Sequence, residues 1–261
     1  MKRNYLLILL LYLFACEEND SGALNPIGSN IKIETREVLE AGARRLTFYC
    51  ATEKIYECSN YQISTETKSD EGSYNILFKS VEIGPICFTS LGPAVSFIDL
   101  GEIPGGNYSL IVRNGALLSK GKLVVSKGEI VLDFPKLNGI EIISPVTRRV
   151  PENTYWGTIG YSTQASATLV NDFIQTLSDN GAVFAKQVPG NYFYYKIDAN
   201  GDIVVDVENS GYSFTTGLIF QYHNDEADLA ALVQTEGSKL RDKLVIDITS
   251  LSGTQITNLQ E

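Results

Sequence analysis

The sequence predicts a mixed β and α+β fold, in which an N-terminal β-sandwich is followed by a layered α+β domain with two helices. Three observations support this prediction. Short runs of alternating apolar and polar residues, separated by turn residues, fill residues 31–136, as is typical of sandwiches. Helical periodicity occurs only in residues 139–261, among further short strands. The net formal charge is −1 over residues 31–138 and −8 over residues 139–261, which indicates two units with different surfaces.

The first unit is predicted from alternation and from turn residues. In Ile31-Lys32-Ile33-Glu34-Thr35 apolar and polar residues alternate, so one face of the strand can be buried. Asn114-Gly115 marks a hairpin, because both residues accept a positive φ. The run from Gly101 to Leu110 resembles a segment of Ig-like and transthyretin-like modules, which implies a sandwich of that kind. The expected strands cover residues 31–35, 46–50, 55–58, 74–78, 95–100, 107–112, 123–125 and 129–134.

The second unit is predicted to combine strands with two helices in layers. The first helix is expected over Ser166–Asp179, where apolar residues recur on one face, and Gly181 suits a left-handed cap. The second helix is expected to begin at Asn224-Asp225, where acidic residues suit the positive end of the helix. Asn200-Gly201 marks a hairpin. The expected strands cover residues 155–161, 182–185, 192–197, 203–207, 212–222 and 244–248, and one more strand, 140–143, is expected in the segment 134–151 that joins the two units.

The N-terminus has the composition of a cleaved leader. Lys2 and Arg3 precede an apolar run from Tyr5 to Phe14, and Ala15-Cys16 follows it. The run is shorter than the roughly 20 residues that a membrane-spanning helix needs. The pattern resembles the bacterial lipoprotein signal peptide, and this resemblance implies that Cys16 is acylated, becomes the mature N-terminus and anchors the protein in a membrane. The alternatives are a plain secretory leader or an uncleaved anchor, both with an unmodified cysteine.

Residues 16–30 are expected to form a flexible acidic tether, because they contain Gly, Pro, Ser and Asn with few apolar residues. The residue after the cysteine is Glu17 and not aspartate, so the resemblance implies sorting to the outer membrane, on the cell surface or the periplasmic face. The segment Glu17-Glu18-Asn19-Asp20 also resembles the surface-export signal of Bacteroidetes lipoproteins. An acidic solvated tether without a sorting role is the alternative of equal weight. The predicted organisation is a signal peptide (1–15), a tether (16–30), a β-sandwich domain (31–136) and an acidic α+β domain (139–261).

The cysteines suggest one disulfide. Of the four cysteines, Cys16 would carry the lipid, and an odd number remains. Cys50 and Cys58 flank a polar stretch between two aromatic-rich runs, so a hairpin could bring them together, and we predict that they pair. Cys87 would then be a small buried hydrophobe, although its pairing with one of the other two is the main alternative. No CxxC pair or Cys/His cluster occurs, which argues against a zinc site.

The charge and the remaining motifs limit the classes of ligand. A formal net charge of −10 argues against nucleic acid as a partner, because an acidic surface repels phosphates. Asp198-Ala199-Asn200-Gly201-Asp202 offers the oxygen ligands that calcium prefers. Its glycine is at position 4, however, instead of position 6 as in an EF-hand. A tight hairpin is therefore preferred, calcium is a weaker alternative, and no other cofactor is expected. His223 could act as a general base oriented by Asp225 or Asp228, but a capping role is preferred.

The leading functional hypothesis is a non-catalytic, lipid-anchored envelope protein that binds a protein, a glycan or an envelope component. Tyr192 and Tyr194 are the predicted binding residues, because they share one face of an aromatic strand and exposed tyrosines offer flat amphipathic surfaces. The alternative is an extracytoplasmic carboxylate-dependent hydrolase, assisted by calcium, which would need two carboxylates roughly 5–9.5 Å apart. A third class is an accessory protein whose exposed edge strand adds to a partner's sheet.

Overall fold

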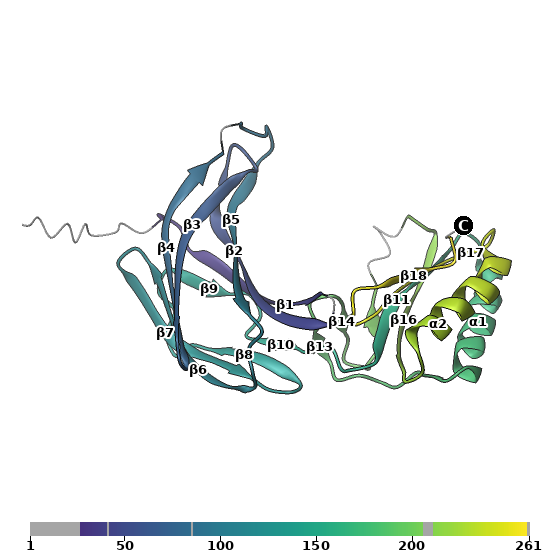
Figure 1. The fold of residues 1–261 in the computed structure, drawn as a ribbon. Helices are drawn as coiled ribbons and strands as arrows, with labels where there is room; N and C mark the ends of the chain where they lie inside the picture. The colour runs from purple at the N-terminus through teal and green to yellow at the C-terminus, as the bar shows by residue number, and fades with distance from the viewer. Residues whose placement is uncertain (1–26, 41, 85, 206–210, 260–261) are drawn as a thin grey trace, which may run out of the picture.

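The computed structural model of the protein describes residues 27–40, 42–84, 86–205 and 211–259 (Figure 1). Over these residues the protein is mostly β. A curled ten-stranded mixed sheet is followed by a five-stranded and a three-stranded antiparallel sheet with two α-helices. The predicted signal peptide, together with Cys16 and most of the predicted tether, lies outside the described residues.

The first sheet contains ten strands in the order β10-β8-β7-β6-β4-β3-β5-β2-β1-β9. Most neighbouring strands are antiparallel, but β1 and β9, β3 and β5, and β4 and β6 pair in parallel. The strands are β1 Ile31–Glu40, β2 Ala43–Tyr56, β3 Tyr61–Asp70, β4 Ser73–Ile83, β5 Gly92–Gly101, β6 Gly106–Asn114, β7 Leu117–Val125, β8 Glu129–Asp133, β9 Ile140–Ile142 and β10 Val146–Arg148.

One face of this sheet encloses the first core. In β1, buried and half-buried residues alternate from Ile31 to Leu39, as the sequence predicts. Register shifts interrupt the pairing of β2 with β5 twice and that of β3 with β4 once. Such bulges increase the local twist of a strand, so the sheet curls around its apolar face (Figure 1). The largest fully buried side chains of this core include Phe48, Phe78, Ile31, Ile76, Leu110 and Leu123.

A single curved sheet takes the place of the predicted sandwich of two packed sheets. β5 pairs with β2 along most of its length and with β3 through one residue pair, Gln62↔Val95. The parallel pairing of β4 with β6 then continues the sheet into β7, β8 and β10. Pairing between strands that are distant in sequence leaves no local signal, so alternation alone does not distinguish one curled sheet from two. β9 and β10, which follow residue 136, also belong to this sheet.

The five-stranded sheet carries both helices on one face. Its order is β12-β16-β11-β17-β18. The predicted first helix is confirmed as α1, Ala167–Asp179, and Gly181 after it has a φ of +99°. The second is confirmed as α2, Glu226–Leu232, which continues as a π-helical turn, Val233–Gly237, and a 3-10 turn, Ser238–Leu240. A 3-10 turn, Gln164–Ser166, precedes α1, and the strands are β11 Thr154–Tyr161, β12 Ala182–Val183, β16 Phe214–Tyr222, β17 Leu244–Thr249 and β18 Gln255–Thr257.

The other face of this sheet packs on the three short strands β13 Gly190–Asn191, β14 Lys196–Ile197 and β15 Ile203–Val204. Two neighbours in β11 show the two sides, because Tyr155 packs in the core beneath the helices whereas Trp156 packs with Ile197. Leu39 of β1 and Val150 also pack with Trp156. We call this group, which also contains Tyr192 and Tyr195, the junction core. It joins the end of the β1–β2 hairpin to the second part of the protein (Figure 1).

Candidate functional site

The tyrosines predicted to form a binding surface belong to the junction core or pack against it. Tyr192 is only 4% exposed, its ring is stacked 4.8 Å from that of Tyr195, and its hydroxyl donates to a backbone carbonyl at 2.9 Å. Tyr194 is 36% exposed, but its hydroxyl accepts the backbone N–H of Leu39 at 2.8 Å and its ring centroid lies 5.3 Å from that of Trp156. The prediction of Tyr192 as an exposed ligand contact is therefore wrong, and Tyr194 links β1 to the second part of the protein.

The backbone explains why the aromatic segment does not behave as a strand. Phe193 has a φ of +68°, and strand pairing resumes only at β14. This left-handed residue interrupts the alternation of side chains, so Tyr192 and Tyr195 share the buried side. Burial raises the pKa of Tyr192, Tyr194 and Tyr195. These phenols therefore serve packing and fixed hydrogen bonds.

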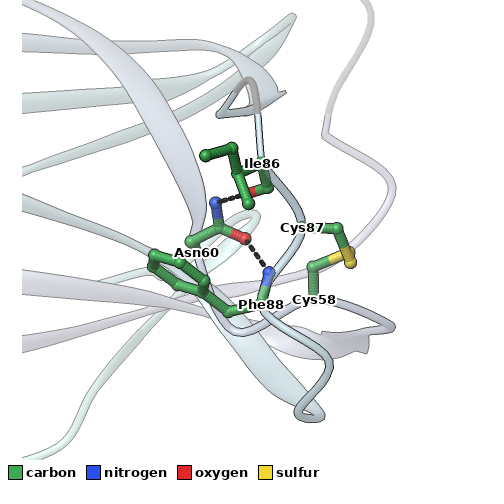
Figure 2. The surroundings of a disulfide bond; sticks show 5 residues. All are labelled: Cys58, Asn60, Ile86, Cys87 and Phe88. Atoms are coloured by element: carbon green, nitrogen blue, oxygen red, sulfur yellow. Dashed lines mark hydrogen bonds between the residues drawn. A yellow bond between two sulfur atoms is a disulfide. The ribbon is translucent and has the colours of Figure 1, made fainter.

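The disulfide joins Cys58 to Cys87, and the predicted Cys50–Cys58 pair is wrong (Figure 2). Cys50 lies within β2, where its side chain is fully buried in the first core, and burial raises the pKa of its thiol to about 12. Cys58 lies beyond the end of β2, so the two side chains do not meet. Pairing through Cys87, the stated alternative, is the one observed. Structural disulfides are typical of oxidising compartments, so the bond indicates an extracytoplasmic domain.

The segment considered for calcium is a tight hairpin between β14 and β15, as preferred from the sequence. The carboxylate of Asp198 accepts the backbone N–H groups of Asn200 and Asp202 at 2.8 and 2.9 Å, and these bonds lower its pKa. The carboxylate of Asp202 accepts both of its hydrogen bonds at 2.9 Å from the ammonium of Lys186. Within the described part of the chain, no group of three His, Cys, Asp or Glu side chains could hold a metal ion.

The strongest candidate site is a cleft of about 400 Å³ where the two parts of the protein meet. Arg44 reaches it from β2, Lys127 from the turn between β7 and β8, and Arg149 from the segment after β10. The end of β16 and the residue after it contribute Gln221 and His223. We call this cavity the junction cleft, and its remaining lining residues are Gly128, Val150, Pro151, Glu152 and Asn153.

A buried carboxylate holds two of the cations in place. The side chain of Glu37 in β1 is 4% exposed, and its Oε1 accepts a hydrogen bond from Nε of Arg149 at 2.7 Å and lies 2.6 Å from Nη2 of the same guanidinium. Arg44 lies 3.9 Å from the same oxygen and donates to the carbonyl of Val150. Arg149 also donates to the carbonyl of Ser126 at 3.1 Å. With Lys127 and Glu152 included, the cleft and its support carry a net charge of +1, in a chain of net charge −10.

The histidine of the cleft is positioned by an amide. The Nδ2 atom of Asn153 lies 3.1 Å from Nδ1 of His223. Because an amide nitrogen can only donate, Nδ1 is the acceptor in this contact. Asn153 itself has a φ of +57°, and its carbonyl accepts the backbone N–H of Tyr222 at 2.9 Å. Asp225, considered above as an orienting group for His223, instead caps α2 by accepting the N–H of Ala227 at 3.4 Å.

Sequence reasoning singled out His223 but missed the cations of the junction cleft. Arg44, Lys127 and Arg149 come from three separate segments, so no spacing connects them. One local signal was present, since Arg148-Arg149 is a pair of adjacent cations in a region whose net charge is −8. A charge count over whole halves of the chain conceals such a local excess.

Comparison with protein-family models, with curated proteins and with solved structures finds no match. Among the helices of the described residues, none is both long and apolar enough to cross a membrane.

Proposed function

We propose that this chain is a lipid-anchored, extracytoplasmic binding protein whose ligand carries a negative charge and occupies the junction cleft. The observation that supports this proposal is that three cations, Arg44, Lys127 and Arg149, line the cleft with a single carboxylate, Glu152. A cleft lined mainly by one sign of charge focuses the electric field and attracts a ligand of the opposite sign. The acidic surface elsewhere repels the same ligand, which favours binding at the cleft.

The uncharged polar side chains of the junction cleft indicate which kind of anionic ligand would bind there. Asn153 and Gln221 offer amide groups and His223 offers an imidazole, and all three side chains can exchange hydrogen bonds with hydroxyl groups. The volume of about 400 Å³ lies within the range of about 300–1,000 Å³ that is usual for small-molecule sites. A carboxylated sugar fits this combination, with its carboxylate toward the cations and its hydroxyls toward the amides. We therefore propose an acidic glycan as the ligand.

The test is titration calorimetry with a hexuronate trisaccharide and with the neutral hexose trisaccharide of the same linkage. We expect binding of the acidic sugar alone, with an affinity that falls as salt is added. Lys127→Gln should weaken binding about tenfold, because a hydrogen bond to a charged group contributes about 1.5–3 kcal/mol. Lys120→Gln is the matched control, since Lys120 is exposed on β7 and is not part of the cleft lining. Equal affinity for the neutral sugar, or no effect of Lys127→Gln, would exclude the cleft as the site.

The two competing hypotheses gain no support from the described residues. A carboxylate-dependent hydrolase uses two acidic side chains, and the junction cleft is lined by one, Glu152. An accessory protein that donates an edge strand needs a long unpaired edge. The edge strands of the two larger sheets, β9, β10, β12 and β18, have only two or three residues each, and where β1 continues past β9 the hydroxyl of Tyr194 accepts the backbone N–H of Leu39. A non-catalytic binding role is the proposal that agrees best with this geometry.

The proposed anchor is an acyl group on Cys16, in the outer membrane. It is supported by the resemblance of the N-terminus to a lipoprotein signal peptide, and the disulfide is in keeping with an extracytoplasmic location. More than one acyl chain gives durable attachment, whereas one alone binds marginally. The acidic segment Glu17-Glu18 supports the cell surface over the periplasmic face. Labelling of intact cells with a membrane-impermeant reagent would distinguish the two faces.

A thiol count tests the anchor on the protein as it is made in its host. With Cys58 and Cys87 in a disulfide and Cys16 acylated, the denatured, unreduced chain should offer one thiol for alkylation, that of Cys50. The folded protein should offer none, because burial keeps the Cys50 thiol inaccessible and raises its pKa to about 12. A second thiol in the denatured chain, without an acyl group detected by mass spectrometry, would contradict the anchor.

A further inference from the structure

An exposed apolar cluster lies at the open end of the β3–β4 hairpin. It consists of Ile55 in β2, Ile83 at the end of β4, and Ile86, Phe88 and Leu91 in the segment before β5. We call these five residues the apolar tip. Their exposed fractions range from 49% to 76%. Single exposed apolar residues are ordinary on a protein surface, but a local group of this size marks an interaction surface.

The apolar tip is held in a defined conformation. The disulfide Cys58–Cys87 joins the segment before β3 to the segment after β4 (Figure 2). The side chain of Asn60 donates to the carbonyl of Ile86 at 2.5 Å and accepts the backbone N–H of Phe88 at 3.3 Å. In Figure 2 the Cys87 side chain points to the opposite side of this segment from Ile86 and Phe88. These constraints keep apolar side chains in water instead of letting them fold back onto the sheet.

The apolar tip lies beside the point where the N-terminal segment enters the fold. β1 begins at Ile31, which pairs with Thr52 of β2, and the backbone N–H of Glu53 donates to the carbonyl of Asn30 at 2.9 Å. Ile55 of the tip follows two residues after Glu53. The second part of the protein contacts the opposite end of β1, through Leu39. The point where the described chain begins and the apolar tip therefore belong to the same end of the first sheet.

We infer that the apolar tip inserts into the surface of the membrane that carries the acylated Cys16, an inference that rests on the proposed anchor. Cys16 precedes Ile27, the first described residue, by eleven positions, and a chain of that length spans at most about 40 Å, so the anchor holds the tip within reach of the bilayer. The charges near the tip are one lysine, Lys54, and three carboxylates, those of Glu53, Glu57 and Glu82, which sum to −2. This mixture does not select anionic headgroups, so the apolar side chains themselves make the contact, with zwitterionic lipid.

The test places a tryptophan at the apolar tip of the mature, lipidated protein. Phe88→Trp protein is reconstituted in phosphatidylcholine–phosphatidylethanolamine vesicles, with or without bromine on the acyl chains. We expect its emission to shift to shorter wavelength and to be quenched by the brominated lipid. The matched control is Phe97→Trp, because Phe97 is 63% exposed but lies within β5, where it pairs with Tyr49 of β2. The native Trp156 is buried and contributes the same background to both proteins.

The outcomes separate this inference from the proposed anchor. Quenching of Phe88→Trp well above that of Phe97→Trp supports insertion, and Leu91→Asp in the Phe88→Trp protein should reduce that quenching severalfold. Equal quenching of the two tryptophan variants overturns the inference, and it is also the result expected if the tip binds a protein partner. Mass spectrometry of the same sample reads the acyl group on Cys16 independently. If Cys16 is acylated but Phe88→Trp is not quenched, the insertion of the apolar tip is wrong and the anchor stands. If Cys16 is not acylated, the proposed anchor is wrong.

Discussion

The clearest test of how the two parts of the protein are joined is the substitution Glu37→Gln. Glu37 is the only acidic side chain within 4.0 Å of the cationic groups of Arg44 and Arg149 among the described ion pairs. Glutamine keeps the shape of the side chain and one acceptor oxygen but removes its charge. The two guanidinium groups would then share the junction with no carboxylate within 4.0 Å among the described ion pairs.

The structure sets the expected magnitude. The side chains of Glu37 and Arg149 are 4% and 15% exposed, so water screens this pair weakly. Removing one partner of a buried ion pair usually destabilises a protein by about 3–5 kcal/mol. Arg149 keeps its bond to the carbonyl of Ser126, and the glutamine oxygen still accepts a hydrogen bond. We therefore expect the free energy of unfolding to fall by about 3 kcal/mol, at the lower end of that range.

The assay is urea unfolding followed by tryptophan fluorescence. Trp156 is the only tryptophan of the chain and lies in the junction core, so its emission reports this region. The matched control is Glu34→Gln, on the same strand. Glu34 accepts two hydrogen bonds from Arg36, at 2.7 and 2.9 Å, but both side chains are about a quarter exposed. The control should lose less than about 1 kcal/mol. If the free energy of unfolding falls equally in Glu37→Gln and Glu34→Gln, burial does not make the Glu37–Arg149 ion pair stronger than the exposed one.

The same substitution, Glu37→Gln, should strengthen the binding of the proposed ligand even though it lowers the stability of the protein. Without the negative charge of Glu37, the junction cleft and its support become more positive by one unit, so an acidic sugar should bind several times more tightly at low salt. This gain should shrink as salt is added. A protein that is less stable but binds its ligand more tightly would be difficult to explain by general unfolding. Weaker binding of the acidic sugar would contradict the proposed role of the cations.

Three further predictions concern the fold. Gly157→Ala should destabilise the protein by about 3 kcal/mol in thermal or urea unfolding, because the added Cβ would lie 1.9 Å from a carbonyl oxygen of β17. Its control is Gly128→Ala, where the added Cβ would have no atom within 4 Å, so stability should change by less than about 0.5 kcal/mol. Replacing Cys58 and Cys87 by serine should lower the unfolding free energy by about 3–4 kcal/mol, since the bond closes a loop of 29 residues. Two lysines lower the pKa of Glu66 from 4.5 to about 2. The contribution of Glu66 to stability is therefore present above pH 4.5 and is lost as the pH falls toward 2. Urea unfolding midpoints measured across this pH range should depend less on pH in Glu66→Gln than in the native protein.

Local signals predicted the elements that depend on neighbours in sequence. The apolar stripe and the glycine after it located α1 to within one residue at its start, and Asn200-Gly201 located the β14–β15 hairpin. The strand β3 was missed because Ile63 is its single buried residue, so no alternation marks it. The joining of ten strands into one sheet was missed for a different reason. It depends on pairs such as β3 with β5 and β4 with β6, which are not adjacent along the chain.

The candidate site was the least predictable part. The choice of Tyr192 assumed the period of a continuous strand, and one residue with a positive φ, Phe193, was enough to remove that period. The pairing of Cys58 was ambiguous in sequence, because the position of Cys87 depends on where β4 ends and β5 begins. The cleft depends on segments that the fold brings together from β2, the β7–β8 turn and β16. Its charge therefore becomes visible only in three dimensions.

The proposed membrane contact and the proposed ligand site lie at opposite ends of the β1–β2 hairpin. Ile31 and Glu37 are six residues apart along β1, which corresponds to about 20 Å at the rise of a strand. The start of β1 and the apolar tip belong to the first end, and the junction cleft lies at the second. Sites separated by more than about 7–10 Å without shared partners contribute independently. If the membrane contact and the ligand site are distinct, Leu91→Asp should leave the affinity for the acidic sugar unchanged, and Lys127→Gln should leave tip insertion unchanged. Any coupling between them would mean that the curled sheet transmits a change from one end to the other.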